Sequence, residues 1–346
     1  MLDKIKSPAD IRKLSISQLI ILAAEVRSRI IDVTAKNGGH VAPSLGATDI
    51  AISLLKVFDP LINRIVWDVG HQSYAYKILT ERNRQFDSLR QFNGLSGFNN
   101  IFESKYDAFG VGHSSTSISA ALGITVAKEM RKEEGLAIAV IGDGALTGGI
   151  ALEALNHAGH LQKKMIVILN DNEMSISKNV GALQNYLTNM LVSKPYNKLK
   201  EQVWALSHTL PDSIRGKFIT GAQKLEESFM NILIPNIIFE DLGFKYVGPV
   251  DGNNIHRMVR ILQKVKTNMH GPILIHTITR KGKGYSFAEK NSQMFHGLGP
   301  YYKETGICKS KKSISFSNVF GNVLCNLAEN NSEVVAVTAA MADGTG

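Results

Sequence analysis

The sequence has little cysteine and no long apolar run, and each absence excludes a class of protein. Its two cysteines, Cys308 and Cys325, are too few and too close to one end for a disulfide framework, and neither belongs to a Cys-x-x-Cys or Cys/His cluster. No segment approaches the roughly 18 uninterrupted apolar residues of a membrane-spanning helix. A disulfide-rich secreted protein is excluded, no membrane partner is expected, and a reducing cytoplasm is the natural setting.

The N-terminal segment lacks the cleavage site of a signal peptide. Its apolar stretch is short, and Glu25, Arg27 and Arg29 follow it at once. This pattern predicts an amphipathic surface helix. No internal repeat is evident.

The chain is basic but has no motif for nucleic-acid binding. Lysine and arginine total 39 against 30 acidic residues, which gives a net charge of +9. The basic residues are scattered as short pairs and triplets, without interleaved aromatic residues. We therefore expect a solvated basic surface and no nucleic-acid partner. The alternative, a nucleic-acid binder, would show salt-dependent retention on DNA.

The length and the composition predict a large folded core. A chain of 346 residues with 44% hydrophobic residues can form one large domain or two ordinary ones. The polar, aromatic and basic stretch at 177–234 predicts a flexible insertion. A Lys-Ser-rich linker at 309–315 is followed by a pattern that predicts one helix and one strand of a second domain.

Three consecutive segments in the middle of the chain predict a βαβ unit. The apolar run AIAVIGDG is followed by the helical pattern ALTGGIALEALNHAG and then by a second apolar run, MIVILNDN. Two more strand-like runs are IVWDVGH, ending at His71, and PILIHTIT. This order predicts an α/β fold: a parallel sheet with helices on both faces, and a ligand at the carboxyl ends of the strands.

Polar residues at two of these strand ends predict one site for Mg²⁺ and a diphosphate. Asp143 and Asn172 supply the hard oxygen ligands that Mg²⁺ prefers. Gly142 and Gly144 allow the backbone to pass close to a diphosphate, and a helix beginning near Leu146 would point its amide end toward that charge. A lone Gly-Asp-Gly is common in turns; its pairing with Asn-Asp-Asn on the following strand makes the prediction specific.

This pairing resembles the thiamine-diphosphate signature of the transketolase and 2-oxoacid dehydrogenase superfamily. Within the superfamily, the residues around the two motifs are similar to the deoxyxylulose-phosphate synthase family. Further similar segments run in order from about residue 30 to residue 346: GGHVAPSLG, IVWDVGHQSYAYKILT, VGHSSTSIS, GFKYVGPVDGNN, RKGKGYSFAEK, MFHGLGP and VTAAMADGTG.

The resemblance implies a set of site residues. Mg²⁺ ligands would be Asp143, Asn172 and the backbone carbonyl of Met174. His40 and His296 would be catalytic and would handle protons and orient the substrate, a task that suits a side chain with a pKa near neutrality. The residues around the cofactor would be His71, Gly112, His113, Ser114, Gly144, Ala145, Asn172 and Tyr285. Without the resemblance, each histidine would more often be a surface or core residue.

The resemblance also implies a fold, a reaction and an assembly. Residues 1–308 would form a thiamine-diphosphate-binding domain, and residues 309–346 a linker and the start of a pyrimidine-binding domain. Thiamine diphosphate would act as an electron sink while pyruvate loses CO₂ and condenses with D-glyceraldehyde 3-phosphate to give 1-deoxy-D-xylulose 5-phosphate. That reaction begins non-mevalonate isoprenoid (terpenoid) precursor synthesis and feeds thiamine synthesis. The family is homodimeric.

One family segment is missing from the sequence. The glutamate that contacts the aminopyrimidine ring lies in the family in an Ile-Ala-Glu-Gln-His segment, which does not occur here, and Asp343 lies upstream of its place. Three interpretations stay open: a fragment of a full enzyme, the amino-terminal half of a split transketolase-like enzyme, or a non-catalytic module that binds the cofactor. Release of CO₂ from pyruvate would distinguish the family's reaction from a transketolase's.

Overall fold

The centre of the fold is a five-stranded parallel sheet. The computed structural model describes residues 1–172, 182, 237–309, 314–338 and 345. The strand order is β1-β2-β3-β5-β4, and every neighbouring pair is parallel. The strands are β1 (Arg64–Trp67), β2 (Ala137–Gly142), β3 (Met165–Asp171), β4 (Lys245–Asp251) and β5 (Ile273–Ile278). The predicted α/β fold with a parallel sheet is confirmed.

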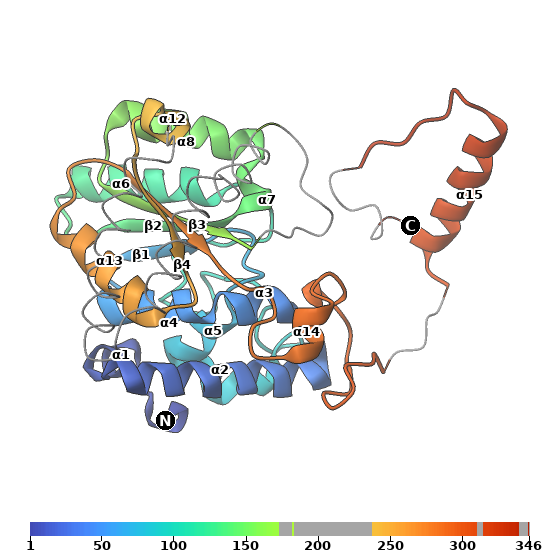
Figure 1. Cartoon of the computed structure of the whole chain (residues 1–346), viewed down its shortest axis with the longest axis horizontal. Coiled ribbons are helices and arrows are strands. Elements are labelled where there is room, and N and C mark those ends of the chain that lie inside the picture. The colour runs from blue at the N-terminus through green and yellow to red at the C-terminus, as the bar shows by residue number, and fades with distance from the viewer. Residues whose placement is uncertain (173–181, 183–236, 310–313, 339–344, 346) are drawn as a thin grey trace, which may run out of the picture.

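Helices cover both faces of this sheet (Figure 1). One face packs against α6 (Ser117–Arg131), α8 (Gly149–Leu161) and α12 (Ile237–Asp241). The other packs against helices from the first part of the chain and against α13 (Ile255–Thr267). Alternate residues of β2 point into the two cores, Ile138 into one and Ala139 into the other. Because both faces are buried, the strands read as continuous apolar runs.

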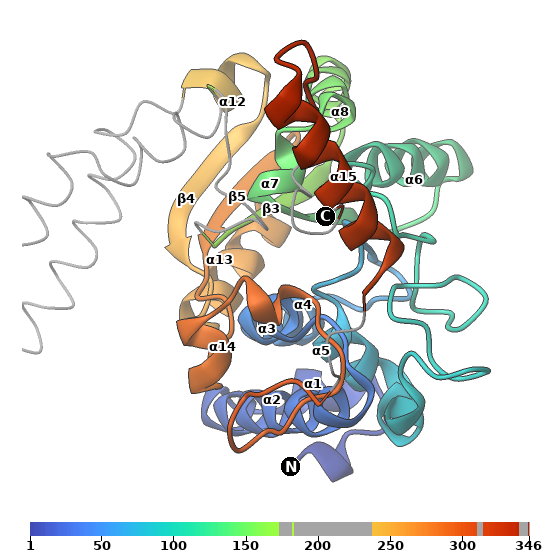
Figure 2. The same ribbon diagram turned by 90° about the vertical axis from the view of Figure 1, so that its right-hand side faces the viewer.

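The first part of the chain forms a helical layer below the sheet (Figures 1 and 2). Its longest element is α2 (Ile16–Asn37), which begins at a capping box made by Ser15 and Gln18 and confirms the predicted amphipathic helix. The other elements are η1 (Leu2–Lys4), α1 (Pro8–Lys13), α3 (Val41–Gly46), α4 (Thr48–Val57), α5 (Tyr74–Lys77), η2 (Ile78–Arg82) and η3 (Asn83–Ser88).

Two elements differ from the sequence-based prediction. The helix expected to begin near Leu146 is divided into α7 (Asp143–Leu146) and α8, which starts at Gly149. β4 was not predicted, because Gly248 and Pro249 interrupt its apolar pattern. The strand tolerates them since it lies at the sheet edge, with its register shifted between Val247 and Val250.

The last part of the chain contains α14 (Ser286–Lys290), η4 (Met294–His296) and α15 (Phe316–Asn330). Figure 1 shows α15 apart from the sheet and its helical layers. The helix predicted after the linker is thus confirmed, whereas the strand expected next does not form within residues 331–338. The expected insertion at 177–234 falls almost wholly outside the described residues, as do linker positions 310–313. Among the described residues, no helix is both long and apolar enough to cross a membrane.

Candidate active site at the carboxyl ends of the strands

Two adjacent strands place Asp143 and Asn172 at the same edge of the sheet. Gly142 at the end of β2 lies opposite Asn170 of β3, so the residues that follow the two strands are neighbours. The Oδ1 atom of Asn172 is buried and makes no hydrogen bond within the described residues. A buried oxygen without a partner is costly unless a ligand satisfies it. This pair fits the oxygen ligands of a Mg²⁺ ion.

The carboxyl group of Asp143 is arranged to receive a cation. Burial, reinforced by the nearby Asp171, raises its pKa to about 6, against the opposing effects of backbone amides and of Lys281. Asp143 is 3% exposed. A bound cation would offset this unfavourable environment and favour the ionised carboxylate.

The third expected metal ligand, the carbonyl of Met174, lies outside the described residues. Within the described part of the chain, no group of three or more His, Cys, Asp or Glu residues could hold a metal ion. Mg²⁺ commonly combines a few protein oxygens with phosphate oxygens and water. The pair of Asp143 and Asn172 therefore fits a Mg²⁺ ion that is shared with a diphosphate.

Three of the expected histidines form one cluster. The ring centroids of His71 and His296 are 5.3 Å apart, those of His40 and His296 5.8 Å, and those of His40 and His71 6.1 Å. They come from three segments: the start of α3, the turn after β1, and η4. Each Nδ1 atom is buried and makes no hydrogen bond within the described residues. Three such nitrogens in one place fit a site whose ligand supplies their partners.

Burial keeps these imidazoles neutral at neutral pH. It lowers the pKa of His40 to about 4, that of His296 to about 3, and that of His71 well below its ordinary value. A neutral imidazole has one nitrogen that donates and one that accepts a hydrogen bond. The cluster can thus accept a proton at one atom and donate one at another.

Backbone pairing positions His40 against His296. The amide of Gly39 donates to the carbonyl of Leu298 at 2.8 Å, and the amide of Leu298 donates back at 3.2 Å. Gly38 has φ of 76°, and a Cβ atom there would lie 2.6 Å from the same carbonyl. Glycine is therefore required at this crossing.

Hydrogen bonds join two loops that were expected to lie around the cofactor. Ser115 follows the Gly112-His113-Ser114 segment, and its hydroxyl donates to the carbonyl of Ala145 at 2.7 Å. Asp68, 3% exposed, accepts from the amides of Ser115 at 2.8 Å and Ser117 at 3.0 Å. His113 is exposed and Ser114 half-buried. A Cβ atom on Gly112 would meet no described atom within 4 Å, which leaves room for a ligand.

Tyr285 lies in a different environment. Its ring packs against Phe287, Phe295 and Tyr301, and its hydroxyl donates to the carbonyl of Lys303 at 2.8 Å. Burial raises its pKa to about 12. The aromatic cluster supports η4, because Phe295 directly precedes His296.

Lys281 is a site residue that the sequence reasoning missed. It is 6% exposed, and burial lowers its pKa to about 8, opposed by the charge of Asp143. Its charge also lowers the pKa values of His71 and His296, so it lies near both the carboxylate and the histidines. Its position three residues after β5 was the available signal, since the ends of parallel strands carry ligand-binding residues.

Asn170 was also missed, and it joins three strand ends. Its Nδ2 atom donates to Gln72 at 2.7 Å, in the turn after β1, and its Oδ1 atom accepts from Thr279 at 2.7 Å, after β5. A pocket of about 670 Å³ opens beside the ends of β3, β4 and β5, and Asn172, Thr279 and Lys281 are among its lining residues. The geometry therefore assembles a polar ligand site from β1, β2, β3 and β5.

The sequence profile of the 1-deoxy-D-xylulose-5-phosphate synthase family matches residues 2–279. Among curated relatives, proteins named 1-deoxy-D-xylulose-5-phosphate synthase from Carboxydothermus hydrogenoformans and Desulfotalea psychrophila are 52% and 51% identical to the whole chain. The matches cover 55% and 54% of these two proteins. The chain thus spans about half the length of the curated relatives it matches.

Solved structures of transketolases share the fold. The enzyme from Leishmania mexicana aligns with a TM-score of 0.57 at 18% identity, over 96% of this chain and 46% of its own. The enzyme from Campylobacter jejuni aligns with a TM-score of 0.58 at 19% identity, over 88% of this chain and 45% of its own. At these identities the likeness concerns the fold alone.

Proposed function

This chain belongs to the 1-deoxy-D-xylulose-5-phosphate synthase family, and we propose that it forms the thiamine-diphosphate and Mg²⁺ site of such an enzyme. The whole protein would decarboxylate pyruvate and join its remaining two carbons to D-glyceraldehyde 3-phosphate, giving 1-deoxy-D-xylulose 5-phosphate and CO₂. The product of this reaction would feed the synthesis of isoprenoid precursors and of thiamine.

One observation carries this proposal: buried polar atoms without protein partners among the described residues converge at one edge of the sheet. They are the Oδ1 atom of Asn172 and the Nδ1 atoms of His40, His71 and His296. An unsatisfied buried polar atom costs about 1–3 kcal/mol, so four of them, brought together from four segments of the chain, favour a site whose ligand pairs them. A polar ligand that offers both donors and acceptors would satisfy them.

Residues at the strand ends would hold the diphosphate end of the cofactor. Asp143 and Asn172 would bind Mg²⁺, with the carbonyl of Met174 as a proposed third ligand. The amide of Ala145 in the first turn of α7 would face the phosphate oxygens, while the amide of Gly144 donates to the Asp143 carboxyl group beside it. Lys281 would add a positive charge beside them. The bound cofactor would supply an electron sink for the carbon from which CO₂ departs.

The histidines would handle protons and position the substrates. His40 and His296 are neutral at neutral pH, so each can accept a proton from a substrate hydroxyl or donate one to a carbonyl oxygen. Phe98, whose ring centroid lies 5.4 Å from that of His40, would help to exclude water. His71, stacked on His296, would orient that ring.

We also propose the setting in which the enzyme works. The two free cysteines, Cys308 and Cys325, support a reducing cytoplasm. The family resemblance supports a homodimer, which sedimentation velocity of the purified protein would test. A sedimentation coefficient that corresponds to a single chain would reject the dimer.

Calorimetric titration of thiamine diphosphate with Mg²⁺ tests the cofactor site. Wild type should bind in a Mg²⁺-dependent manner, and Asp143→Ala should lose binding by at least tenfold, because a charge-assisted ligand is removed. Asp3→Ala is the matched control, since Asp3 is an exposed acid far from the strand ends in sequence. Equal affinities of wild type and Asp143→Ala would reject the proposed metal ligand.

A pyruvate decarboxylation assay on the same samples separates binding from turnover. Mg²⁺-dependent binding without CO₂ release would identify a cofactor-binding unit that needs further chain for catalysis. Binding with CO₂ release would mean that groups on this chain complete the reaction. No binding by wild type would contradict the proposal for this chain by itself.

A further inference from the structure

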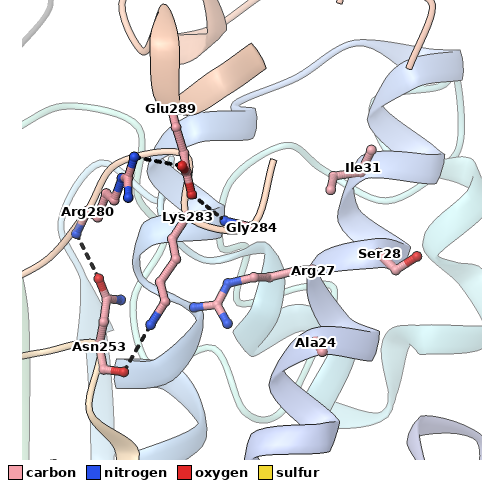
Figure 3. A pocket seen from close by; sticks show the side chains of 9 residues that line it. All are labelled: Ala24, Arg27, Ser28, Ile31, Asn253, Arg280, Lys283, Gly284 and Glu289. Atoms are coloured by element: carbon pink, nitrogen blue, oxygen red, sulfur yellow. Dashed lines mark hydrogen bonds and ion pairs between the residues drawn. The ribbon is translucent and has the colours of Figure 1, made fainter. Parts of the chain in front are cut away.

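A second pocket of about 640 Å³ lies beside the candidate cofactor site. Figure 3 shows it between α2, the loop after β5, and α14. Asn253, Arg280 and Glu289 line both pockets, so the two sites share a wall. The other lining residues of the second pocket are Ala24, Arg27, Ser28, Ile31, Lys283 and Gly284.

Arg27 and Lys283 are held in place by an acid that lies behind the pocket. Arg27 is 8% exposed; its Nη2 atom pairs with Asp49 at 2.5 Å and its Nε atom donates to the carbonyl of Leu45 at 3.2 Å. Lys283 contacts the same oxygen of Asp49 at 3.3 Å. Asp49 is 2% exposed and does not line the pocket. A ligand entering from the open side therefore meets the cations before their counter-charge.

Donors remain available on this cationic wall. The Nη1 atom of Arg27 makes no hydrogen bond within the described residues, and Arg27 points toward Lys283 in Figure 3. Gly284, with φ of 87°, allows the loop to approach Arg27, because a Cβ atom there would lie 3.0 Å from Arg27 Cδ. The close approach brings the guanidinium and the ammonium to the same end of the pocket.

Arg280, in the shared wall, is a third cation, and both carboxylate oxygens of its partner Glu289 already have partners. Arg280 pairs with Glu289 at 2.8 Å, and the other oxygen of Glu289 accepts from the amide of Gly284 at 2.8 Å. Of the described residues that line the pocket, three are cations and one is an acid. Beside Arg27, α2 also contributes Ala24, Ser28 and Ile31 to the lining, and two of these are apolar.

We propose that this pocket binds a small organic molecule that carries a phosphate dianion. The phosphate would lie against Arg27 and Lys283, since guanidinium and ammonium groups make charge-assisted hydrogen bonds to phosphate oxygens. The carbon part would lie against Ala24 and Ile31. The site is distinct from the cofactor site, because the ion pair of Arg280 and Glu289 stands between them, and the proposal does not depend on the cofactor's identity.

Titration of inorganic phosphate, followed by ³¹P NMR line broadening, tests this site. Wild type should bind phosphate, and Lys283→Gln should weaken binding by at least tenfold through loss of one charge-assisted contact. Arg280→Gln should have a smaller effect, because that side chain is 69% exposed and already paired. Lys264→Gln, an equal charge change on the exposed face of α13, is the control and should bind like wild type.

The variant Asp143→Ala separates the two sites. If this variant keeps its phosphate affinity while Lys283→Gln loses it, the second pocket is supported. This holds even if the titrations show no cofactor binding at the strand-end site. If Asp143→Ala loses phosphate binding and Lys283→Gln retains it, the phosphate binds in the cofactor site, and the proposal is overturned. Absence of phosphate binding by wild type, or an equal loss in Lys264→Gln, would also overturn it.

Discussion

At the scale of single residues, the cluster of His40, His71 and His296 links stability to pH. Their folded-state pKa values lie below the ordinary value near 6.5, because burial disfavours the charged imidazole. The unfolded chain therefore binds more protons between about pH 6.5 and pH 4, and the folded state loses stability as the pH falls through this window. Each histidine contributes a slope of about 1.4 kcal/mol per pH unit.

Urea unfolding between pH 7.5 and pH 4.5 measures this slope. In the variant His40→Gln this slope should fall by about the contribution of one proton, because one imidazole fewer takes up a proton on unfolding. His256→Gln, an exposed position on α13, is the matched control. A slope for His40→Gln equal to that of wild type would show that His40 is not held neutral by burial.

Asp68 is a positioning residue for the loop at 112–114. Replacement by alanine removes the acceptor of the Ser115 and Ser117 amides and leaves two buried donors unpaired, which costs about 1–3 kcal/mol each. We expect Asp68→Ala to weaken Mg²⁺-dependent thiamine diphosphate binding, while Asp68→Asn, which keeps one acceptor oxygen, restores part of it. Calorimetry on both variants checks this, and equal affinities for Asp68→Ala and wild type would contradict it.

The sequence identifies residues that contact a ligand more readily than residues that support them. His40, His71 and His296 were predicted from motifs, and the structure brings all three together. Asp68 and Lys281 were not predicted, because their roles arise from contacts with residues far away in the sequence. Their positions just after β1 and β5 were the only available signal, because residue type alone does not separate a buried acid or lysine from a surface one.

At the scale of elements, a buried ion network replaces regular structure in residues 96–107. Arg82 pairs with Asp107 at 2.6 Å and with Glu103 at 3.0 Å, and Lys77 also pairs with Glu103. Asn99 donates to Asp107 at 2.8 Å. This network fixes the segment that leads to the loop at 112–114.

Replacing Arg82 by methionine should destabilise the fold by about 3–5 kcal/mol, because Asp107 would stay buried without its main partner. The midpoint of urea denaturation at pH 7 measures the change. Arg131→Met is the matched control, since that side chain is 74% exposed and its ion pair with Glu133 is weak. A loss below about 1 kcal/mol in Arg82→Met would show that water or rearrangement satisfies Asp107.

Elements with a clean periodic pattern were predictable, and those shaped by tertiary contacts were not. β2, β3 and β5 are buried on both faces and appear in the sequence as apolar runs. β4 carries Gly248 and Pro249 at the sheet edge, where a missing amide hydrogen is tolerated. The break between α7 and α8 falls where Ser115 packs against Gly148, so closely that a Cβ atom on Gly148 would lie 2.3 Å from the Ser115 hydroxyl oxygen. No local pattern reveals that contact.

At the scale of the whole molecule, the candidate site depends on both helical layers. Asp143 and Asn172 follow strands at the centre of the sheet, whereas His40 and His296 belong to the layer of α2 and α3, and the loop at 112–114 leads into α6 on the other face. The fold class was predictable because one βαβ pattern implies both layers. Which loops meet at the sheet edge was not, since it depends on long-range contacts.

A ligand that joins these parts should stabilise the whole folded chain. Thiamine diphosphate with Mg²⁺ at about 100 times its dissociation constant should raise the free energy of unfolding by about 2.7 kcal/mol, provided that it binds the folded state alone. Thermal unfolding with and without the ligands measures this as a rise in Tm for wild type and for Asp3→Ala. Asp143→Ala should show no rise, because its site lacks a metal ligand. A wild-type Tm that stays fixed while calorimetry reports binding would mean that the ligand also binds the unfolded chain, and that the strand-end site does not account for the affinity.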